Sequence, residues 1–455
     1  MSRTVIIGAG IAGISAAYHL AIRGGRRDVI LIDEREPLTL TSDKGTWGYR
    51  NWWPGPDDTM CRFVSRSIEL LEGLAEESND AFALNRRGYL FVTSDPTRVE
   101  EMRVTARQVS SFGMGPVREH GAGGGAAGSY APAPPSEWRG QPSGADLLVG
   151  DEAVLGAFPY LALDSCGALH VRRAGTLEAS LLGHWMLARA ISAGVRLVRD
   201  RVTGIPSAGG RVNGVELLGG TTLACDEVVI AAGPLLDHAG RMLGLELPVF
   251  HELHAKLTLR DPARAVPRGA PFVISLDPMV LPWTDEERAQ LARAEETRSL
   301  VAPFPGGVHV RPVDRETGTE LFYIWTYDAE RRAFSWPPVF DPWYGEVCVR
   351  GASRLVPGLA VYRGGAGLGT VDGGYYCKTI DNRPLIGPLP VEGAYALGAL
   401  SGYGVMASAS AAELIALHLE GAPLPPYAAA LLPSRFDDPA YEARVAAWSG
   451  SGGQL

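Results

Sequence analysis

Cysteine is scarce in this chain of 455 residues. No two cysteines have the two-residue spacing of a redox disulfide or a zinc site, and no cluster of cysteine with histidine is present. We therefore expect no metal site, and we expect reduced thiols, as in a cytoplasmic protein. The cysteines are Cys61, Cys166, Cys225, Cys348 and Cys377.

Long apolar runs and an excess of positive charge are absent as well. No run approaches the roughly 20 apolar residues that a membrane-spanning helix needs. The net charge of −9 argues against nucleic acid or an anionic membrane as a partner. A strand pattern begins close to Met1, which leaves no room for a signal peptide. We expect a cytoplasmic protein that binds neither nucleic acid nor membranes.

Glycine, in contrast, is abundant, and one glycine-rich turn has an informative context. The turn reads Gly8-Ala9-Gly10-Ile11-Ala12-Gly13. A buried-strand pattern over residues 3–7 precedes it, helical spacing over 11–22 follows it, and a second strand over 28–32 ends at Asp33. Strand, GxGxxG turn, helix and acid in this order are typical of a dinucleotide-binding domain.

The residues of this turn have distinct expected roles. Gly8 permits the tight turn, Gly10 lets backbone N–H groups approach a pyrophosphate, and Gly13 lets the helix pack closely on the strand. The helix N-terminus contributes partial positive charge, and the Asp33 carboxylate can accept from a ribose hydroxyl. The alternative is a glycine-rich turn that binds no ligand. The neighbouring candidates for cofactor contact are Ile11, Ala12, Glu34 and Arg35.

The length and the order of patterns predict two domains. Helix and strand patterns typical of an α/β protein are interrupted by a strand-rich block over 247–330. Residues 121–144 are a Gly/Ala/Pro-rich tract, which we interpret as a mobile, tolerated insertion rather than a lid. The predicted segments are 1–85, 151–246 and 346–436 for a cofactor domain, 86–150 and 247–345 for a substrate domain, and 437–455 for a C-terminal tail.

Individual elements follow from local periodicity. Helices are predicted over 59–74, 175–194 and 404–419, and from Thr284, where Thr284-Asp285-Glu286-Glu287 has the spacing of a capping box. Strands are predicted over 88–92, 195–198, 211–217, 226–232 (broken by Gly233-Pro234), 256–259, 271–274, 307–310 and 321–325.

Three further segments carry a family resemblance. Residues 200–205 (DRVTGI), followed by Val228-Val229-Ile230-Ala231-Ala232-Gly233-Pro234, are similar to the second nucleotide-contact segment of the D-amino-acid oxidase/sarcosine oxidase–glycine oxidase superfamily. Residues 375–388 (YYCKTIDNRPLIGP) and 398–406 (GALSGYGVM) resemble that family's C-terminal signature. The resemblance implies FAD as cofactor and an α/β fold, in which a Rossmann-like (GR2-type) FAD-binding domain carries an inserted substrate domain of mixed β-sheet and helices.

The resemblance also assigns expected cofactor contacts. The Val202 backbone would meet the adenine, and Ala232 and Gly233 would pass beside the pyrophosphate. Thr41, Ser42 and Lys44 are candidate donors in the loop at 41–50. Gly402, Tyr403, Gly404, Val405 and Met406 would lie over the isoalloxazine, where a helix N-terminus stabilises negative charge on a reduced flavin by about 0.3–1 kcal/mol.

Covalent attachment of the flavin is not expected. In relatives the link uses a histidine of the early loop or a cysteine near the C-terminal signature. No histidine lies between Leu20 and His120, and Cys377 stands about three positions beyond the usual cysteine. We expect non-covalent FAD.

The reaction implied by the resemblance is oxidation of an amine or amino acid. Hydride would pass from the C–H next to the amine to flavin N5, giving an imine. Arg50 would grip a substrate carboxylate or, alternatively, hold its own loop through backbone carbonyls. Tyr376 and Lys378 would share one strand face toward the active cavity. Met406 stands where sarcosine oxidases have a lysine, which favours a bulkier or less acidic amine.

Other aromatic and histidine residues have two readings. Trp47, Trp52, Trp53 and Trp325 could line an aromatic pocket or pack in the core. His251, His254 and His309 lack metal-like spacing, so packing and hydrogen bonding are expected of them.

The electron acceptor is O2 or another molecule. Fast oxidases of the family carry a lysine beneath the flavin, but the strand over 321–326 has none. Lys256, on a neighbouring strand, could substitute for it or be an ordinary strand-edge lysine. The missing lysine favours a dehydrogenase or a slow oxidase. An NAD(P)H-dependent flavin monooxygenase would need a second fingerprint, and the glycines at 121–125 stand in a Pro/Ala tract instead. A flavin-carrying, non-catalytic subunit of a complex remains a further alternative.

Overall fold

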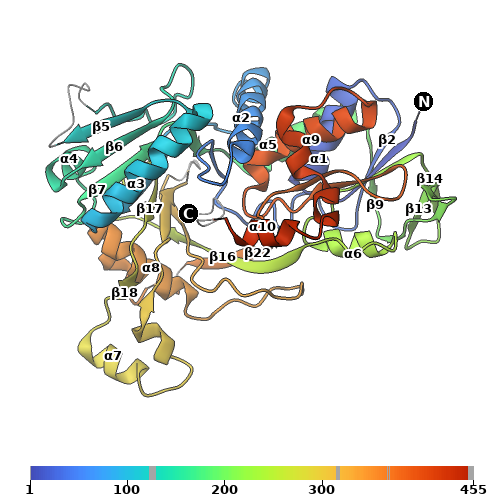
Figure 1. Cartoon of the computed structure of the whole chain (residues 1–455). Coiled ribbons are helices and arrows are strands. Elements are labelled where there is room, and N and C mark those ends of the chain that lie inside the picture. Colours follow the sequence, from blue (N-terminus) through green and yellow to red (C-terminus); the bar gives the residue numbers. More distant parts are fainter. Residues whose placement is uncertain (1, 122–129, 314–317, 366, 368, 449–455) are drawn as a thin grey trace.

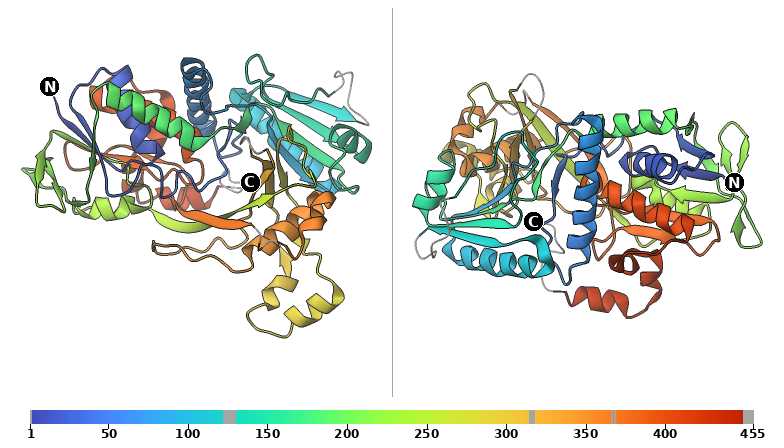
Figure 2. Two further views of the ribbon diagram at one scale, coloured as in Figure 1. Left: turned by 180° about the vertical axis from the view of Figure 1, so that it is seen from behind. Right: turned by 90° about the horizontal axis from the view of Figure 1, so that it is seen from above.

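The computed structural model describes residues 2–121, 130–313, 318–365, 367 and 369–448. Figures 1 and 2 show two lobes side by side, each built on one large β-sheet. The lobe that contains the N-terminus holds a six-stranded sheet, and the other holds a nine-stranded sheet. Both are mixed α/β, as the sequence predicts.

The six-stranded sheet has the order β23-β24-β15-β1-β2-β9, with β1 near its centre. All neighbours are parallel except β23, which pairs antiparallel with β24. The central strands are apolar on both faces because helices or further strands cover each side. Its strands are β1 Thr4–Ile7, β2 Val29–Asp33, β9 Arg196–Arg199, β15 Glu227–Ile230, β23 Leu385–Pro388 and β24 Ala394–Gly398.

Alternating side chains of β1 separate the two cores of this lobe. Ile6 packs among the helices α1, α5 and α9, while Val5 and Ile7 pack on the other face toward β13 and α6. The predicted helix after the glycine turn continues past α1 as a π-helical turn, His19–Arg23, and ends at Gly24. The elements are α1 Ile11–Tyr18, α2 Thr59–Ser78, α5 Ala179–Ser192, α6 Leu236–Arg241, α9 Gly404–Glu420, β10 Val202–Gly204, β11 Ser207–Ala208, β12 Arg211–Val212, β13 Gly214–Leu217 and β14 Thr222–Ala224.

The nine-stranded sheet has the order β22-β16-β21-β20-β17-β4-β7-β6-β5. Its pairs are antiparallel except β17–β4 and β5–β6. The helix predicted from Thr284 projects from this lobe, and its capping box joins Thr284 to Glu287 (Figure 1). The strands are β4 Tyr89–Thr93, β5 Val117–Gly121, β6 Ala145–Val149, β7 Gly167–Val171, β16 Phe250–Arg260, β17 Phe272–Ser275, β20 His309–Pro312, β21 Glu320–Ile324 and β22 Thr370–Lys378.

In the described part of the chain, the second lobe also has four helices, and two further pairs of short strands lie outside the large sheets. The helices of the second lobe are α3 Pro96–Val109, α4 Asp151–Ala157, α7 Asp285–Leu291 and α8 Tyr344–Leu355. The two-stranded pairs are β3 Gly48–Arg50 with β8 Ala174–Thr176, and β18 Met279–Val280 with β19 Pro303–Phe304.

Two strands lie in a different sheet from the one that the predicted segments imply. β7, in the segment 151–246, and β22, in the segment 346–436, both belong to the nine-stranded sheet. β22 pairs with β16 from Thr370 to Lys378. Pairing between strands so far apart in sequence is not visible in local periodicity, so the segment boundaries themselves stay a prediction.

The described part of the Pro-rich tract is anchored, in contrast to the expected mobility. Trp138 is buried, and four arginines of the second lobe donate to backbone carbonyls of the tract. The pairs are Arg172 with Ala131, Arg87 with Pro135, Arg86 with Pro142, and Arg118 with Ser143. Residues 122–129 lie outside the described residues.

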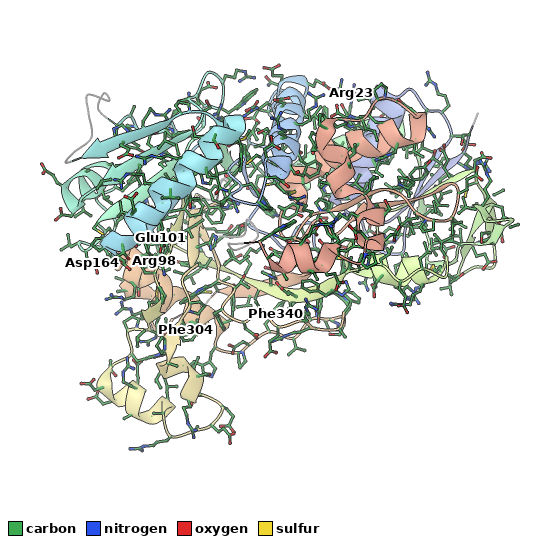
Figure 3. The ribbon with its side chains drawn as sticks, viewed as in Figure 1. Arg23, Arg98, Glu101, Asp164, Phe304 and Phe340 are labelled. Carbon is green, nitrogen blue, oxygen red and sulfur yellow. The ribbon has the colours of Figure 1, made fainter. Side chains whose placement is uncertain are left out.

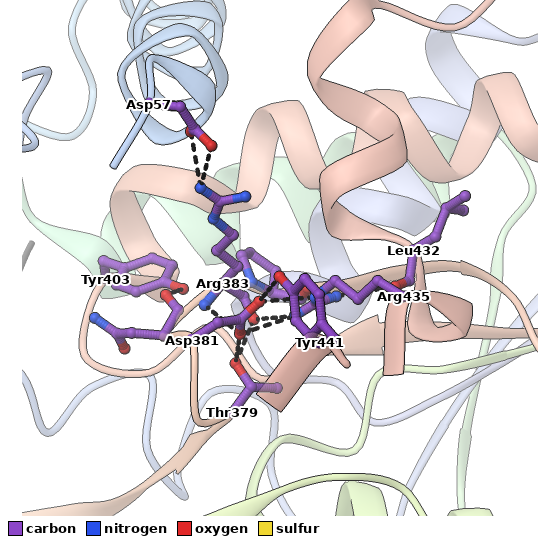
Figure 4. Close-up of polar contacts among 10 residues, drawn as sticks. Asp57, Thr379, Asp381, Arg383, Tyr403, Leu432, Arg435 and Tyr441 are labelled. Atoms are coloured by element: carbon purple, nitrogen blue, oxygen red, sulfur yellow. Dashed lines mark hydrogen bonds and ion pairs between the residues drawn. The ribbon is translucent and has the colours of Figure 1, made fainter. Parts of the chain in front are cut away.

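The C-terminal segment is also anchored where we expected a tail. The helix α10, Tyr441–Ala446, follows a 3-10 turn over Pro433–Asp437. Figure 4 shows Arg435 and Tyr441 both bonded to the buried Asp381. Residues 449–455 lie outside the described residues.

Candidate active site

A cavity of about 780 Å³ lies where the two sheets meet. Its walls come from the carboxyl ends of β1, β2 and β15, the start of α9, and the strands β16, β21 and β22. Open parallel sheets commonly bind ligands at the carboxyl ends of their strands. The volume is typical of a site for a sizeable small molecule.

The turn after β1 forms one wall of the cavity and requires glycine at positions 8 and 13. Gly8 has a φ of +108°, and a Cβ there would lie 2.4 Å from the carbonyl oxygen of Ala231. A Cβ on Gly13 would lie 1.9 Å from the Gly8 oxygen. Gly8, Gly10, Ile11 and Ala12 line the cavity, whereas Gly13 stands behind it, in the helix–strand packing role expected of it.

The acidic residue that ends β2 fixes this wall. Asp33 Oδ2 accepts from the Ala9 N–H at 2.7 Å, and Oδ1 accepts from the Arg35 N–H at 2.8 Å. Burial raises the pKa of Asp33, while these two backbone hydrogen bonds oppose that shift. Each carboxylate oxygen retains a free lone pair for a ligand hydroxyl.

Glu34 and Arg35, which follow Asp33, line the same cavity as the predicted nucleotide contacts at Val202, Ala232 and Gly233. Glu34 Oε2 accepts from Arg201 Nε at 2.6 Å. Arg35 Nε is buried without a hydrogen-bond partner among the described residues.

The loop after β2 brings two of its three predicted donors to the cavity. The Ser42 hydroxyl accepts from the Ile11 N–H at 2.9 Å, and Thr41 Oγ1 donates to the Tyr375 carbonyl at 3.3 Å. Lys44 is not among the lining residues; its Nζ pairs with Asp43 at 3.0 Å and Asp372 at 3.7 Å. The structure therefore does not bring Lys44 to the predicted site.

The amino-terminal end of α9 points at the cavity. All residues from Gly402 to Met406 line it, and the first backbone N–H groups of a helix have no partner within the helix. Tyr403 is held by its hydroxyl, which donates to the Asn382 carbonyl at 2.7 Å, and by Trp53, whose ring centre is 4.9 Å away. The same end would stabilise negative charge on a bound group.

Arg50 lies at the cavity wall and also bonds to the backbone of its own loop, as the loop-holding alternative expects. It is buried, lines the cavity, and donates from Nε to the Trp52 carbonyl at 3.1 Å. Its guanidinium carbon lies 5.4 Å from the Tyr89 ring centre and 5.7 Å from that of Trp53. Burial lowers the pKa of Arg50, and Tyr89 offsets part of that shift.

A row of hydrogen-bonded polar side chains lies beneath the cavity, on β22, on β16 and just after β21. Tyr376 lines the cavity and stacks on His254 with ring centres 4.0 Å apart. His254 Nε2 lies 3.0 Å from Glu252 Oε2, and Nδ1 lies 2.9 Å from the Thr326 hydroxyl. Lys378 Nζ donates to Glu252 at 2.9 Å and does not line the cavity. Tyr376 and Lys378 thus have different surroundings.

Sequence reasoning missed several lining residues of this region. His254, His309 and Thr326 line the cavity, as do Tyr89 and Phe272. One signal was available for His254, because Glu252, His254 and Lys256 alternate along one strand and share a face. Of the tryptophans, Trp47 and Trp53 line the cavity, while Trp52 and Trp325 are core residues.

A family model described as FAD dependent oxidoreductase (DAO) matches residues 3–417. The chain belongs to this family. Among solved structures, L-proline dehydrogenase from P. horikoshii has a TM-score of 0.72 at 19% identity, over 96% of this chain and 98% of that chain. Glycine oxidase from Geobacillus kaustophilus has a TM-score of 0.71 at 18% identity, over 96% and 99%. At these identities the likeness shows the fold.

Curated relatives match over shorter stretches. Human mitochondrial dimethylglycine dehydrogenase is 26% identical over 281 residues, which are 61% of this chain and 28% of that protein. The rat enzyme is 35% identical over 102 residues, 22% of this chain and 12% of that protein. The chain thus matches 28% of the human protein and 12% of the rat protein, well under half the length of either.

The residues of this DAO-family chain fit FAD. The cradle at Gly8 admits no side chain, two helix N-termini face the cavity, and the buried Arg35 Nε needs an acceptor. Bound FAD would be held by the 8–12 turn, residues 33–35, Thr41, Ser42, Val202, Ala232, Gly233 and the start of α9.

The surroundings of the Cys377 thiol and the Lys256 amino group determine what each can contribute to the site. Cys377 lines the cavity, and burial raises the pKa of its thiol to about 12. Lys256 is not a lining residue; its Nζ lies 3.3 Å from Asp372 and 4.5 Å from the Phe322 ring centre.

The described residues contain neither a cluster of metal ligands nor a membrane-spanning helix. Within these ranges no group of three or more His, Cys, Asp or Glu is placed to hold a metal ion. No described helix combines the length and the apolar character needed to pass through a bilayer.

Proposed function

We propose that this chain oxidises an amine that carries a single carboxylate and an apolar body, and that the product is the imine. Bound FAD supplies the hydride acceptor. The observation that carries the proposal is the surroundings of Arg50, a buried guanidinium at the cavity wall beside Tyr89 and Trp53.

The charges of the cavity support a carboxylate at Arg50. All four acidic lining residues, Asp33, Glu34, Glu36 and Asp200, stand in the segments predicted to bind the nucleotide. Arg50 is surrounded instead by aromatic rings, and a guanidinium can bind a carboxylate through two parallel hydrogen bonds. A buried cation of this kind gains most from an anionic ligand group.

The amine would be held in its neutral form at the same end. The nearby His309 is uncharged at neutral pH, because burial lowers its pKa to about 4. Among the residues that the structure describes, no acidic side chain lines this end of the cavity, so an ammonium group bound there would have no adjacent counter-ion. Loss of the proton on binding is favoured, and a neutral amine is the form that gives up a hydride from the adjacent carbon.

The names of the relatives support the same substrate class. Dimethylglycine, proline and glycine, named in the related dehydrogenases and oxidase, each combine an amine with one carboxylate. Met406, Phe272 and Ile324 make the remaining wall apolar, which favours a bulkier, secondary or cyclic amine.

We further propose that FAD is bound non-covalently and that oxygen is used slowly or not at all. Cys377 is held as an unreactive thiol by burial. Lys256 is engaged by Asp372 and packs against Phe322, so it does not supply a cation to the cavity.

The test compares matched amines with and without a carboxylate under nitrogen, following bleaching of the flavin. For Arg50→Met we expect the rate constant of flavin reduction, divided by the dissociation constant of the substrate, to fall more for carboxylated amines than for their neutral counterparts. The expected difference is roughly 30- to 100-fold. Arg62→Met, on the exposed side of α2, is the matched control and should change neither. An equal loss for both kinds of amine would show that Arg50 does not hold a carboxylate.

A further inference from the structure

A loop of the second lobe, residues 327–341, follows β21 and leads to α8. Its ends are joined, since the Tyr327 hydroxyl donates to Asp341 Oδ2 at 2.7 Å. Compact loops with joined ends are frequently functional. Phe340, labelled in Figure 3, packs against Gly373 of β22.

The middle of this loop reaches the cofactor cavity. The Arg332 N–H donates to the His251 carbonyl at 2.8 Å, which ties the loop to β16. Ser335 Oγ lies 2.9 Å from the Tyr375 hydroxyl, and the Phe334 and Tyr375 ring centres are 5.2 Å apart. Phe334 and Tyr375 both line the cavity.

The tip of the loop contacts the other lobe. The guanidinium carbon of Arg35 lies 4.9 Å from the Trp336 ring centre. Arg35 lines the cavity at the end of β2, two residues after Asp33. Its Nε makes no hydrogen bond within the described residues and lies 3.9 Å from Glu34 Oε1, too far for one. The loop therefore joins both lobes over the part of the cavity formed by residues 33–35.

We propose that the 327–341 loop is a further FAD-binding element that holds the adenosine half of the cofactor and sets the rate at which FAD leaves. Phe334 contacts the cofactor directly. Trp336 acts as a positioning residue, because its ring fixes the Arg35 guanidinium and aims Nε at an acceptor on the nucleotide. The inference rests on FAD binding and is independent of the amine substrate proposed above.

The first test measures FAD release from the holoenzyme by the rise in flavin fluorescence after dilution. For Phe334→Ala and Trp336→Ala we expect the release rate to increase roughly five- to tenfold, as loss of a stacking contact predicts. Val339→Ala is the matched control, since Val339 is on the same loop and 79% exposed. Its release rate should equal that of the unchanged protein.

The second test uses trypsin on the full chain. Arg331 and Arg332 lie exposed on the loop, so cleavage after them reports whether it is closed. FAD should slow this cleavage in the unchanged protein, and Trp336→Ala should reduce that protection. The unfolding temperatures of the cofactor-free variants show that the fold itself is retained.

The outcomes separate the two proposals. Equal release rates for Trp336→Ala, Phe334→Ala and Val339→Ala, or loop cleavage that FAD does not slow, would overturn the loop's role. Protein that holds FAD behind this loop but oxidises no amine would leave the inference standing and remove the proposed function. Protein that binds no FAD would overturn both.

Discussion

Glu252 is the charged centre of the residues beneath the cavity. It contacts Lys378 of the neighbouring strand β22 at 2.9 Å and His254 of its own strand β16 at 3.0 Å. Burial alone would raise the pKa of Glu252, but the hydrogen bonds from His254 and Lys378 lower it. Burial lowers the pKa of His254, Glu252 opposes this shift, and the charge on Lys378 adds to it. Burial is thus the main cause of the lowered His254 pKa, and a lysine outside the cavity adds to it.

Replacing Lys378 by methionine tests the contribution of the lysine. Without that charge the pKa of His254 should rise, so a positive charge appears beneath the cavity at a higher pH. We expect the acidic limb of the rate of flavin reduction to move to higher pH. The measurement is anaerobic reduction across pH 5–9 with an accepted amine.

Lys44→Met is the control for Lys378→Met, since Lys44 also pairs with a carboxylate and does not line the cavity. A pH profile that Lys378→Met leaves in place, with only the stability changed, would make Lys378 purely structural.

Arg50 and Lys378 show how far residue types predict a site. A buried arginine near aromatic residues in the early loop was foreseeable, and the structure places it at the cavity. For Lys378, alternation along the strand predicts the same face as Tyr376. Its amino group instead bonds to Glu252 on the neighbouring strand β16 and does not reach the cavity. The partner stands more than a hundred residues away, where no local pattern reveals it.

The glycine turn between β1 and α1 is the element that the sequence predicts best. Gly8→Ala should destabilise the protein by about 2 kcal/mol or more, because the φ of +108° is strained for alanine and the Cβ meets Ala231. Gly73→Ala, in open space within α2, should stabilise it by about 0.5–1 kcal/mol. Thermal unfolding of both variants without cofactor gives the comparison. A Gly8→Ala protein as stable as the parent would contradict the observed turn.

The C-terminal segment is the element whose role the sequence conceals. Asp381 is fully buried and accepts from Arg435 and Tyr441 (Figure 4), directly behind the loop that carries Tyr403. Arg435→Met should cost about 3–5 kcal/mol of unfolding free energy, because it leaves a buried carboxylate without its cation. A denaturant titration measures this loss.

Arg444→Met is the matched control in the same segment. Its ion pair with Asp438 is about half exposed on both sides, so the expected cost is below about 1 kcal/mol. Similar losses for the two arginine variants would argue against the special role of Asp381.

Predictions of elements and of their assembly differ in quality for a physical reason. The helices α2, α5, α7 and α9 and most strands are confirmed, because each carries its period within one segment. Residues 130–143 are anchored by arginine side chains that donate to backbone carbonyls. Every residue has a backbone carbonyl, so the sequence of the tract does not reveal this anchoring. Composition therefore indicated a loose tract, although its backbone is held.

At the scale of the whole molecule, the chain passes from one sheet to the other between successive strands, and this joins the two lobes. β22 belongs to the nine-stranded sheet, and after a short turn the chain enters β23 of the other sheet. The fold class is confirmed because the alternation of helix and strand patterns is local. The cavity between the lobes depends on long-range pairing, so its lining could be only partly predicted.

Buried histidines in both lobes should make stability depend on pH. Burial lowers the pKa of His19, His170 and His309 to about 4, well below the ordinary value of 6.5. Between these values the unfolded chain binds protons that the folded chain does not. The unfolding free energy should therefore fall as pH drops from 6.5 to 4, by up to about 3 kcal/mol for each histidine, and the contribution of the histidines should not grow further below pH 4.

His170 isolates one contribution to this dependence, because it lies in the second lobe away from the cavity. Its ring contacts the Arg87 carbonyl at 2.7 Å and the Tyr130 hydroxyl at 2.9 Å. Gln at position 170 can still donate to a carbonyl but cannot titrate, so His170→Gln should flatten the fall in unfolding temperature between pH 6.5 and 4. His184→Gln, on the exposed side of α5, should keep the parent slope. An unchanged slope in His170→Gln would mean that this histidine is protonated in the folded protein as readily as in the unfolded chain.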